Sequence, residues 1–226
     1  MRWRLIGLSL ISFSLLFALH MVIPPQHSPF RPPDLNEPLG LATYAKLRHL
    51  KRNPLQCRDV LAAANVDFSI MPADEPAASC PLGETLVLER SMTRYNRAPM
   101  RFSCHQLAAL YLWERRIVRP QAEKVFGTTL AEIQTYGTFS CRNIAGTEKR
   151  SEHAYANAID IYGFIMQDGE RVDIRQHWRE KSPRGKFLAR VHKGACRLFS
   201  VTLGPDFNAD HADHFHLDMG SQTSCK

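Results

Sequence analysis

Three features that would place the chain in a common class are missing from its sequence. None of the six cysteines forms a CxxC arrangement, which argues against a cysteine zinc site and against a thioredoxin-like redox site. There is no internal repeat and no low-complexity tract outside one proline-rich segment, so nothing indicates a repeat architecture. The basic residues form no stripe with interleaved aromatics, which argues against a nucleic-acid-binding class.

The N-terminus has the pattern of an export signal. Arg2 and Arg4 precede the uncharged apolar stretch 5–19, as in the charged and apolar regions of a secretory signal. No good small-x-small cleavage site follows, so residues 1–23 are either a signal peptide or a signal anchor that spans the inner membrane through residues 5–23. With the arginines in the cytoplasm, the rest of the chain would be periplasmic or extracellular. A buried helix of a cytosolic protein would leave the arginines unexplained.

The length of 226 residues suits one domain with a full hydrophobic core. Residues 22–40 hold six prolines, which predicts an extended, polyproline-like spacer that takes no part in the core. We therefore expect a proline-rich linker over residues 24–40 and one folded domain over residues 41–226.

The formal net charge of +7 favours an anionic partner. Because the chain is predicted to be exported, an anionic polymer of the cell envelope or a lipid surface suits this charge better than nucleic acid does. A basic surface that only keeps the protein soluble is the alternative.

All six cysteines follow the export signal, and an even number in an exported chain predicts up to three disulfides. The sequence cannot choose among the roughly 15 possible pairings. Two pairings are taken as hypotheses: Cys104 with Cys141, and Cys196 with Cys225.

The local patterns predict an α+β fold, in which helices pack on a small, mostly antiparallel sheet. Ser103 and Gln106 have the spacing of a capping box before a helical apolar face, and Pro120 lies beyond the expected end of this helix. A hairpin turn is expected at Asp168 and Gly169. The expected helices cover residues 104–117 and 184–198, and the expected strands cover residues 132–141, 158–166, 171–174, 197–204 and 214–220.

The stretch HFHLD, residues 214–218, places two histidines on one face of a strand. Alternate side chains of a strand share a face, so His214 and His216 point one way while Phe215 and Leu217 point into the core. Two adjacent imidazoles are costly in a core and unusual on a random surface, but they suit a metal site.

The stretch SEHAYANAID, residues 151–160, supplies a histidine and a carboxylate. Ile159 and Ile161 share one strand face, which puts Asp160 on the other, and His153 precedes the strand in a turn or a short helical segment. Metal ligands lie within about 2.3 Å of the ion, so a shared ion requires the chain between His153 and Asp160 to fold back. The small alanines of this segment permit that.

Two histidines and one carboxylate, with one position open to water, form a catalytic zinc arrangement, whereas structural sites are closed by four protein ligands. Such a zinc lowers the pKa of its water and polarises a carbonyl group. The candidates for the group that moves protons are His214, His211 and Asp213. A lone histidine is more often a surface or hydrogen-bonded core residue, but four histidines in two short motifs favour metal binding.

The pattern of Ser-x-His, six intervening residues, Asp and a later His-x-His resembles a group of zinc peptidases. This group includes the D-Ala-D-Ala carboxypeptidases, the D-Ala-D-Ala dipeptidases and the penicillin-insensitive murein endopeptidase. Residues 151–160 are similar to the group's SxHxxGxAxD motif, with Ala156 where many members have glycine. HADHFH has the His-x-x-His-x-His spacing of the murein endopeptidase, and Asp213 matches an acidic residue of the carboxypeptidases. Residues 55–226 as a whole resemble bacterial proteins with an extensin-like C-terminal domain.

The resemblance implies a fold and roles for single residues. It implies a metallopeptidase-like core with His153, Asp160 and His216 as zinc ligands and His214 as the proton-transfer or transition-state group. Arg142 would grip a substrate carboxylate, since a guanidinium holds a carboxylate bidentately, although a plain surface arginine is the alternative. Asp206 and Asn208 would either orient an imidazole or form a plain turn, and Ser151 would cap the first motif.

The leading hypothesis is a zinc-dependent peptidase, of murein endopeptidase or DD-carboxypeptidase type, that cleaves peptidoglycan peptides in the cell envelope. Its expected partners are those peptides and, for the N-terminal segment, the cytoplasmic membrane, with no role for nucleic acid. The first alternative is a non-catalytic envelope-binding module that keeps the fold. A structural protein that binds metal only for stability is the second, although disulfides would already provide that stability. A nuclease with a histidine-rich metal site is the third.

Overall fold

The computed structural model describes residues 22–74, 80 and 82–226. Nearly all of the predicted signal peptide or anchor, residues 1–23, lies outside this range, so that prediction stays open. Within the described residues, no helix is both long enough and apolar enough to span a membrane.

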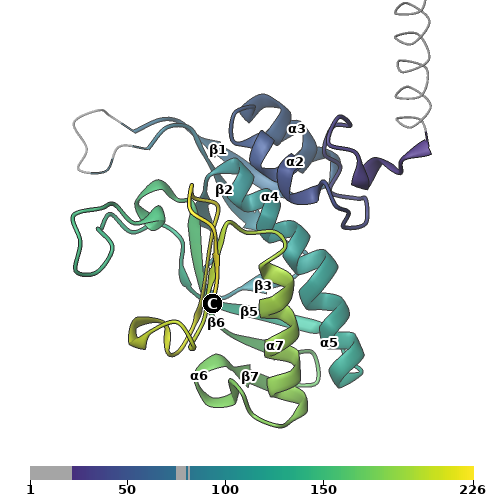
Figure 1. The fold of residues 1–226 in the computed structure, drawn as a ribbon, viewed down its shortest axis with the longest axis vertical. Helices are drawn as coiled ribbons and strands as arrows, with labels where there is room; N and C mark the ends of the chain where they lie inside the picture. Colours follow the sequence, from purple (N-terminus) through teal and green to yellow (C-terminus); the bar gives the residue numbers. More distant parts are fainter. Residues whose placement is uncertain (1–21, 75–79, 81) are drawn as a thin grey trace, which may run out of the picture.

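The fold is α+β, as the sequence predicts, and its centre is a seven-stranded sheet (Figure 1). The strands pair antiparallel except at two edges, where β3 runs parallel to β5 and β10 runs parallel to β8. Strand β7 pairs with β6 to form the expected hairpin. In spatial order the strands are β10 Ser224–Cys225, β8 Val201–Leu203, β9 Phe215–Asp218, β6 Ala158–Met166, β5 Leu130–Gly137 and β3 Arg94–Tyr95, with β7 Arg171–Asp173 beside β6.

A second, three-stranded antiparallel sheet was not predicted. It consists of β1 Asp67–Met71, β2 Thr85–Arg90 and β4 Met100–Phe102. It lies in the part of the chain that also forms the helices α2 Thr43–Leu50 and α3 Pro54–Ala63. The sequence patterns of residues 41–103 gave no expectation for any of these elements.

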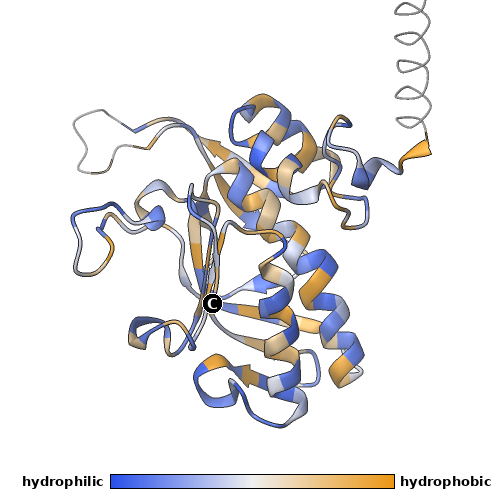
Figure 2. Ribbon diagram, viewed as in Figure 1, coloured by the Kyte–Doolittle hydropathy of each residue, from blue (hydrophilic) through white to orange (hydrophobic). Residues whose placement is uncertain are grey.

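The remaining helices pack against one face of the large sheet, while the connecting loops are mostly hydrophilic (Figures 1 and 2). Trp113, Phe164 and Phe187 pack together in the core. The ring centroid of Phe164 lies 6.1 Å from that of Trp113 and 5.1 Å from that of Phe187. All three side chains are fully buried. The helices on this side are α4 Cys104–Trp113, the π-helical η2 Glu114–Val118, α5 Arg119–Phe126 and α7 Pro183–Ala195, and the short α6 Ile174–His177 precedes α7.

The first predicted helix is longer than expected. Helix α4 continues through η2 into α5, and Pro120 lies in the first turn of α5 and not beyond the end of the helix. Proline is tolerated in a first turn, and the π-helical stretch before it shifts the hydrogen-bond register. Ser103 is the N-cap, but the capping box is wrong: its hydroxyl donates to Asn157 Oδ1, and Gln106 donates to the carbonyl of Leu217.

The three disulfides are Cys57–Cys104, Cys80–Cys141 and Cys196–Cys225. The predicted Cys196–Cys225 pair is confirmed, and the predicted Cys104–Cys141 pair is wrong. Cys104 begins α4, which packs against α3 and therefore meets Cys57. Three disulfides indicate an oxidising, extracytoplasmic environment.

The proline-rich segment lies against the domain, contrary to the expected spacer outside the core. Leu35 is 1% exposed and belongs to the core. The Lys46 ammonium of α2 donates to the carbonyl of Pro25 at 2.8 Å, and Arg115 donates to Asn36 Oδ1 at 2.8 Å. The short 3₁₀ helix η1, Pro25–His27, lies in this segment. Most of the segment is exposed or half-buried, but burial of Leu35 together with these polar contacts attaches it to the domain.

Candidate metal centre

Three elements bring the predicted ligands together. Strands β6 and β9 are antiparallel neighbours, and their register sets Asp160 directly opposite His216. Ile159 and Ile161 are fully buried on the helical side, so Asp160 points to the other face, as predicted. The 3₁₀ helix η3, Glu152–Tyr155, precedes β6 and carries His153. Directly opposed residues of a strand pair lie close enough to share one ion.

The donor atoms of the three residues converge on one point. His216 Nδ1 lies 2.9 Å from Asp160 Oδ1, and His153 Nε2 lies 3.1 Å from Asp160 Oδ2. The two imidazole nitrogens are 3.2 Å apart. Since all three donor atoms lie within 4.8 Å of one another, the residues form a candidate metal-binding group.

The second nitrogen of each imidazole has its own acceptor. His153 Nδ1 donates to the carbonyl of Thr138 at 2.7 Å, and His216 Nε2 donates to Asp218 Oδ2 at 2.9 Å. Asp218 is in turn held by a bond from the Gly220 amide to its other oxygen. Metal-binding histidines nearly always donate their remaining N–H in this way, which fixes the ring orientation. The donor set therefore fits a metal ion.

The site is largely buried, and its charges are strongly coupled. Side-chain exposure is 3% for His153, 13% for Asp160 and 12% for His216. Burial alone would raise the pKa of Asp160, but hydrogen bonds and attraction from the two histidines outweigh it and hold that pKa well below its usual range. Burial would lower the pKa of His216, but the carboxylates of Asp160 and Asp218 raise it to about 9.

The turn that carries His153 depends on two predicted residues. Ser151 is the N-cap of η3 and accepts a hydrogen bond from the His153 amide, so its predicted capping role is confirmed. Ala156 ends η3 with φ of +50° in the left-handed region, which favours glycine. This conformation turns the chain from η3 into β6, and it explains why glycine would suit the position.

His214 lies beside the metal-binding group and is oriented by a carboxylate. Its Nδ1 is 2.9 Å from Asp213 Oδ1, and its Nε2 is 3.6 Å from Asp160 Oδ1. The Tyr136 hydroxyl donates to Asp213 Oδ2 at 3.1 Å, and the Tyr136 ring is stacked on Tyr162. Asp213 therefore binds and orients the His214 ring, and it is not a member of the metal-binding group.

The other predicted site residues are placed less centrally. His211 is adjacent, with its ring centroid 5.2 Å from that of His214, and its Nδ1 is 2.6 Å from Asn208 Oδ1. Burial and the neighbouring imidazoles lower the pKa of His211 to about 4. His211 lies in the 3₁₀ helix η4, Ala209–His211. Asn208 thus orients an imidazole, whereas Asp206 instead accepts bonds from Trp178 and Arg179.

Arg142 has an exposed side chain at the base of the loop between β5 and η3. Its carbonyl accepts a bond from the Ser151 amide at 3.1 Å, which ties the loop to the turn that carries His153. The strand before this loop ends at Gly137, four residues earlier than predicted, and the Cys80–Cys141 disulfide holds the loop.

A second group, His192, Cys196 and Cys225, also has its donor atoms close together. Both of its cysteines are joined in a disulfide, and His192 Nε2 faces the carbonyl of Lys226 at 3.1 Å. Disulfide sulfurs are not thiolates, so this group offers no metal site while the disulfide is intact.

A family model described as extensin-like protein C-terminus matches residues 55–226. The chain belongs to this extensin-like family. All residues of the metal-binding group and all six cysteines lie inside the matched range. Searches of curated proteins and of solved structures find no match to the chain.

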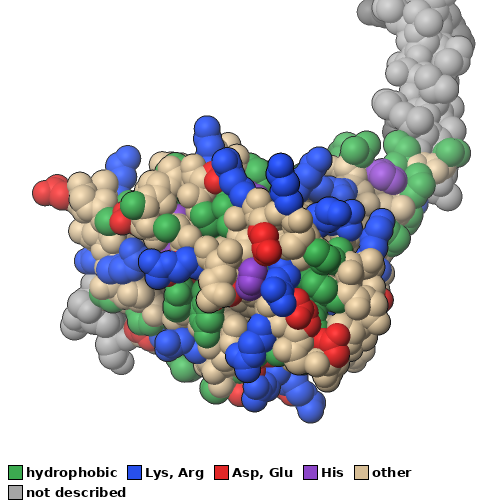
Figure 3. All heavy atoms as spheres, turned by 90° about the horizontal axis from the view of Figure 1, so that it is seen from below, with side chains coloured by type: hydrophobic (Ala, Val, Ile, Leu, Met, Phe, Trp, Pro, Cys, Tyr) green, Lys and Arg blue, Asp and Glu red, His purple; other side chains and the backbone are tan. Residues whose placement is uncertain are grey.

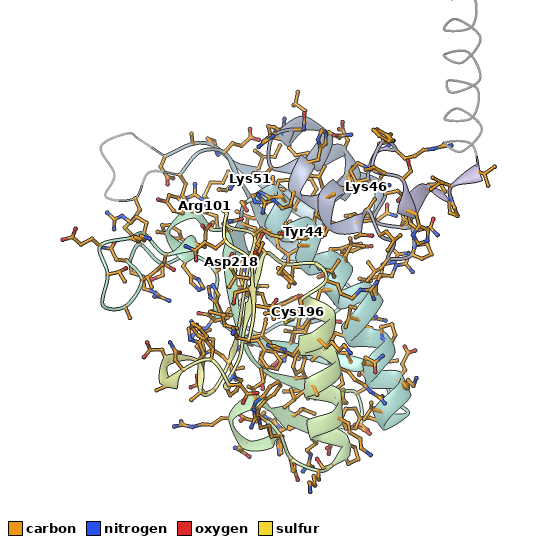
Figure 4. All side chains as sticks on the ribbon, viewed as in Figure 1. Tyr44, Lys46, Lys51, Arg101, Cys196 and Asp218 are labelled. Carbon is orange, nitrogen blue, oxygen red and sulfur yellow. A yellow bond between two sulfur atoms is a disulfide. The ribbon has the colours of Figure 1, made fainter. Side chains whose placement is uncertain are left out.

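Three residues that support the candidate site in this extensin-like domain were not predicted from the sequence: Thr138, Asp218 and Tyr136. Asp218, on β9 (labelled in Figure 4), lies two residues after His216 and thus shares its strand face, a signal that could have identified it. Thr138 acts through its carbonyl, and Tyr136 acts through a pairing between distant segments. No sequence pattern indicates either of these roles.

Proposed function

We propose that this extensin-like domain is a zinc-dependent peptidase that cleaves peptidoglycan peptides outside the cytoplasmic membrane. The observation that carries the proposal is the convergence of His153 Nε2, Asp160 and His216 Nδ1, with a further imidazole alongside. Two histidines and one carboxylate leave coordination positions open, as catalytic zinc sites require. Bound zinc would supply Lewis-acid chemistry: it would polarise the scissile carbonyl and activate water.

The chain's own residues prepare the site for this ion. Asp160 is held ionised, which favours a cation at the point where the three donor atoms meet. Thr138 and Asp218 fix the rings of His153 and His216, so the donor nitrogens need little reorganisation. Such second partners are the usual support of metal-binding imidazoles.

His214 is the group for proton transfer. Asp213 binds its Nδ1, which orients the ring so that Nε2 lies 3.6 Å from Asp160 Oδ1 of the metal-binding group. A carboxylate that holds an imidazole in this way fixes its tautomer and its orientation. From this place His214 would donate a proton to the leaving amine or stabilise the developing oxyanion.

The surroundings suit a peptide of an anionic polymer. Arg142 offers an exposed guanidinium for a substrate carboxylate. The net charge of +7 favours an anionic matrix, and Figure 3 shows lysine and arginine side chains spread over one face among acidic ones. The disulfides fit a periplasmic or extracellular location, with the segment before Val22 as the link to the membrane.

The first test is elemental analysis of the purified full chain. We expect about one zinc per chain in the wild type and little in His216→Ala, because the variant loses one of three ligands. His49→Ala, which removes an exposed histidine elsewhere, serves as the matched control and retains zinc. Purified murein is then digested, and released peptides are identified by mass spectrometry. A wild type that binds no zinc despite intact disulfides contradicts the proposal and leaves a non-catalytic envelope-binding module.

A further inference from the structure

We propose that a pocket behind η3 binds a sugar unit of a glycan strand. The inference rests on the proposed function only in naming peptidoglycan as the polymer, since its glycan and peptide parts would be held at two places. The pocket has a volume of about 430 Å³, within the range of small-molecule sites. Its lining includes Lys51, Glu84, His105, Glu152, Tyr155 and Asn157.

The pocket and the metal centre lie on different faces of the same short helix. A 3₁₀ helix has three residues per turn, so Glu152 and Tyr155 share one face of η3 while His153 points elsewhere. Both Glu152 and Tyr155 line the pocket, and His153 belongs to the metal-binding group. The lining also includes Lys51, which directly follows α2 (labelled in Figure 4). The same short helix therefore carries residues of both the pocket and the metal-binding group.

The pocket is rigid before any ligand arrives. Ser103 donates to Asn157 Oδ1 at 2.7 Å, and Asn157 donates to Glu152 Oε2 at 2.6 Å. The backbone of Asn157 also bonds to Met219. The Cys57–Cys104 disulfide fixes the wall formed by α4. Preformed walls lower the entropy cost of binding.

The charges of the pocket point to a neutral ligand. Lys51 is the cation of the lining, and Glu84 and Glu152 are its carboxylates. Glu84 is already paired with Arg58 at 2.9 Å, which leaves Lys51 and Glu152 as one positive and one negative side chain of the lining. These lining charges balance, which favours hydroxyl and acetamido groups over a phosphate or an amine.

An exposed aromatic ring and a neutral imidazole complete the match to a sugar. Tyr155 is 49% exposed and presents a ring on which the apolar face of a sugar can pack. His105 also lines the pocket, but it is only 7% exposed. Burial lowers the pKa of His105 to about 4, so its ring is neutral and adds no positive charge to the lining.

Calorimetric titration of the full chain with a tetrasaccharide of N-acetylglucosamine tests the proposal. The protein is used without metal, so that binding is measured apart from any hydrolysis. We expect Tyr155→Ala and Lys51→Ala each to weaken binding about tenfold, while Tyr155→Phe, which keeps the ring, changes it less. Lys181→Ala removes another exposed lysine, which lies outside the pocket, and is the matched control. The thermal midpoint of each variant checks its fold.

Two results would overturn the proposal: no heat of binding at millimolar sugar, or binding that Tyr155→Ala and Lys51→Ala leave unchanged. The zinc content of wild type and His216→Ala is measured independently of this titration. Sugar binding without zinc binding would support the sugar-binding pocket and contradict the zinc peptidase. Zinc binding without sugar binding would contradict the pocket and leave the peptidase proposal standing.

Discussion

His216 Nδ1 lies 2.9 Å from Asp160 Oδ1, across the antiparallel pair β6 and β9. In the metal-free protein this contact, with Asp218 on the other ring nitrogen, holds His216 as an imidazolium. A metal ion at this point must replace the proton on Nδ1, so binding and protonation compete.

Zinc affinity is therefore expected to rise with pH. The pKa of His216 is about 9, so the apparent affinity increases about tenfold per pH unit from about pH 6.5 to 9 and then levels off. Titration against a competing chelator across this range measures the slope. A flat profile would show that His216 carries no proton in the metal-free state.

The stability of the metal-free protein should change in the opposite direction. A folded-state pKa raised above the unfolded value contributes stability below about pH 6.5, and this contribution is lost as pH rises through about 9. Denaturant unfolding of the metal-free chain at several pH values measures the loss. In His216→Ala this part of the pH dependence disappears.

Asp218→Asn is expected to weaken zinc binding by about 10- to 100-fold, because the His216 ring loses its carboxylate partner. The amide can still accept one hydrogen bond, so the fold should persist. Chelator competition measures the change, and Asp206→Asn, which alters a carboxylate bonded to Trp178 and Arg179, serves as control. Equal affinities in Asp218→Asn and wild type would show that Asp218 does not support the metal.

His214→Ala should separate metal binding from turnover. The variant keeps all three ligands, so its zinc content is unchanged, but peptide release from murein should fall by about 10²- to 10⁴-fold. Asp213→Asn should lower the rate less, because the imidazole itself remains. Full activity of a zinc-loaded His214→Ala protein would assign proton transfer to another group.

Leu35→Ala tests whether the proline-rich segment belongs to the domain. Loss of this fully buried side chain should lower the free energy of unfolding by about 2 to 5 kcal/mol. Leu41→Ala removes the same atoms from a side chain that is 89% exposed and should change stability by less than about 0.5 kcal/mol. Equal effects of the two variants would restore the view of the segment as a detached spacer.

The sequence predicted the part of the molecule in which chemistry and periodicity coincide. Alternation in residues 158–161 and 214–218 placed Asp160 and His216 away from the core, and the strands at both positions were expected. The C-terminal pair Cys196–Cys225 was also predicted correctly. Local patterns were sufficient here because each strand has one buried face.

The rest depends on contacts between distant segments. The predicted capping box does not form, because both side chains bond to distant residues instead. Ser103 donates to Asn157, and Gln106 donates to the carbonyl of Leu217. The pairing of Cys104 with Cys57 follows from helix packing, which no local pattern encodes. Leu35 was assigned to a spacer because composition alone does not reveal which residue meets a hydrophobic surface.

The strand register between β6 and β9 also limits which changes of length the domain can accept. Side chains alternate along a strand, so one residue inserted or deleted within Phe215–Asp218 would turn His216 into the core and Leu217 outward. The exposed loop 139–150 and the residues 204–213 lie outside these strands and can lengthen without moving the ligands. Differences in length among sequences of this family should therefore appear as insertions in those two loops. Both loops border the site, so such insertions can adapt it to different substrates.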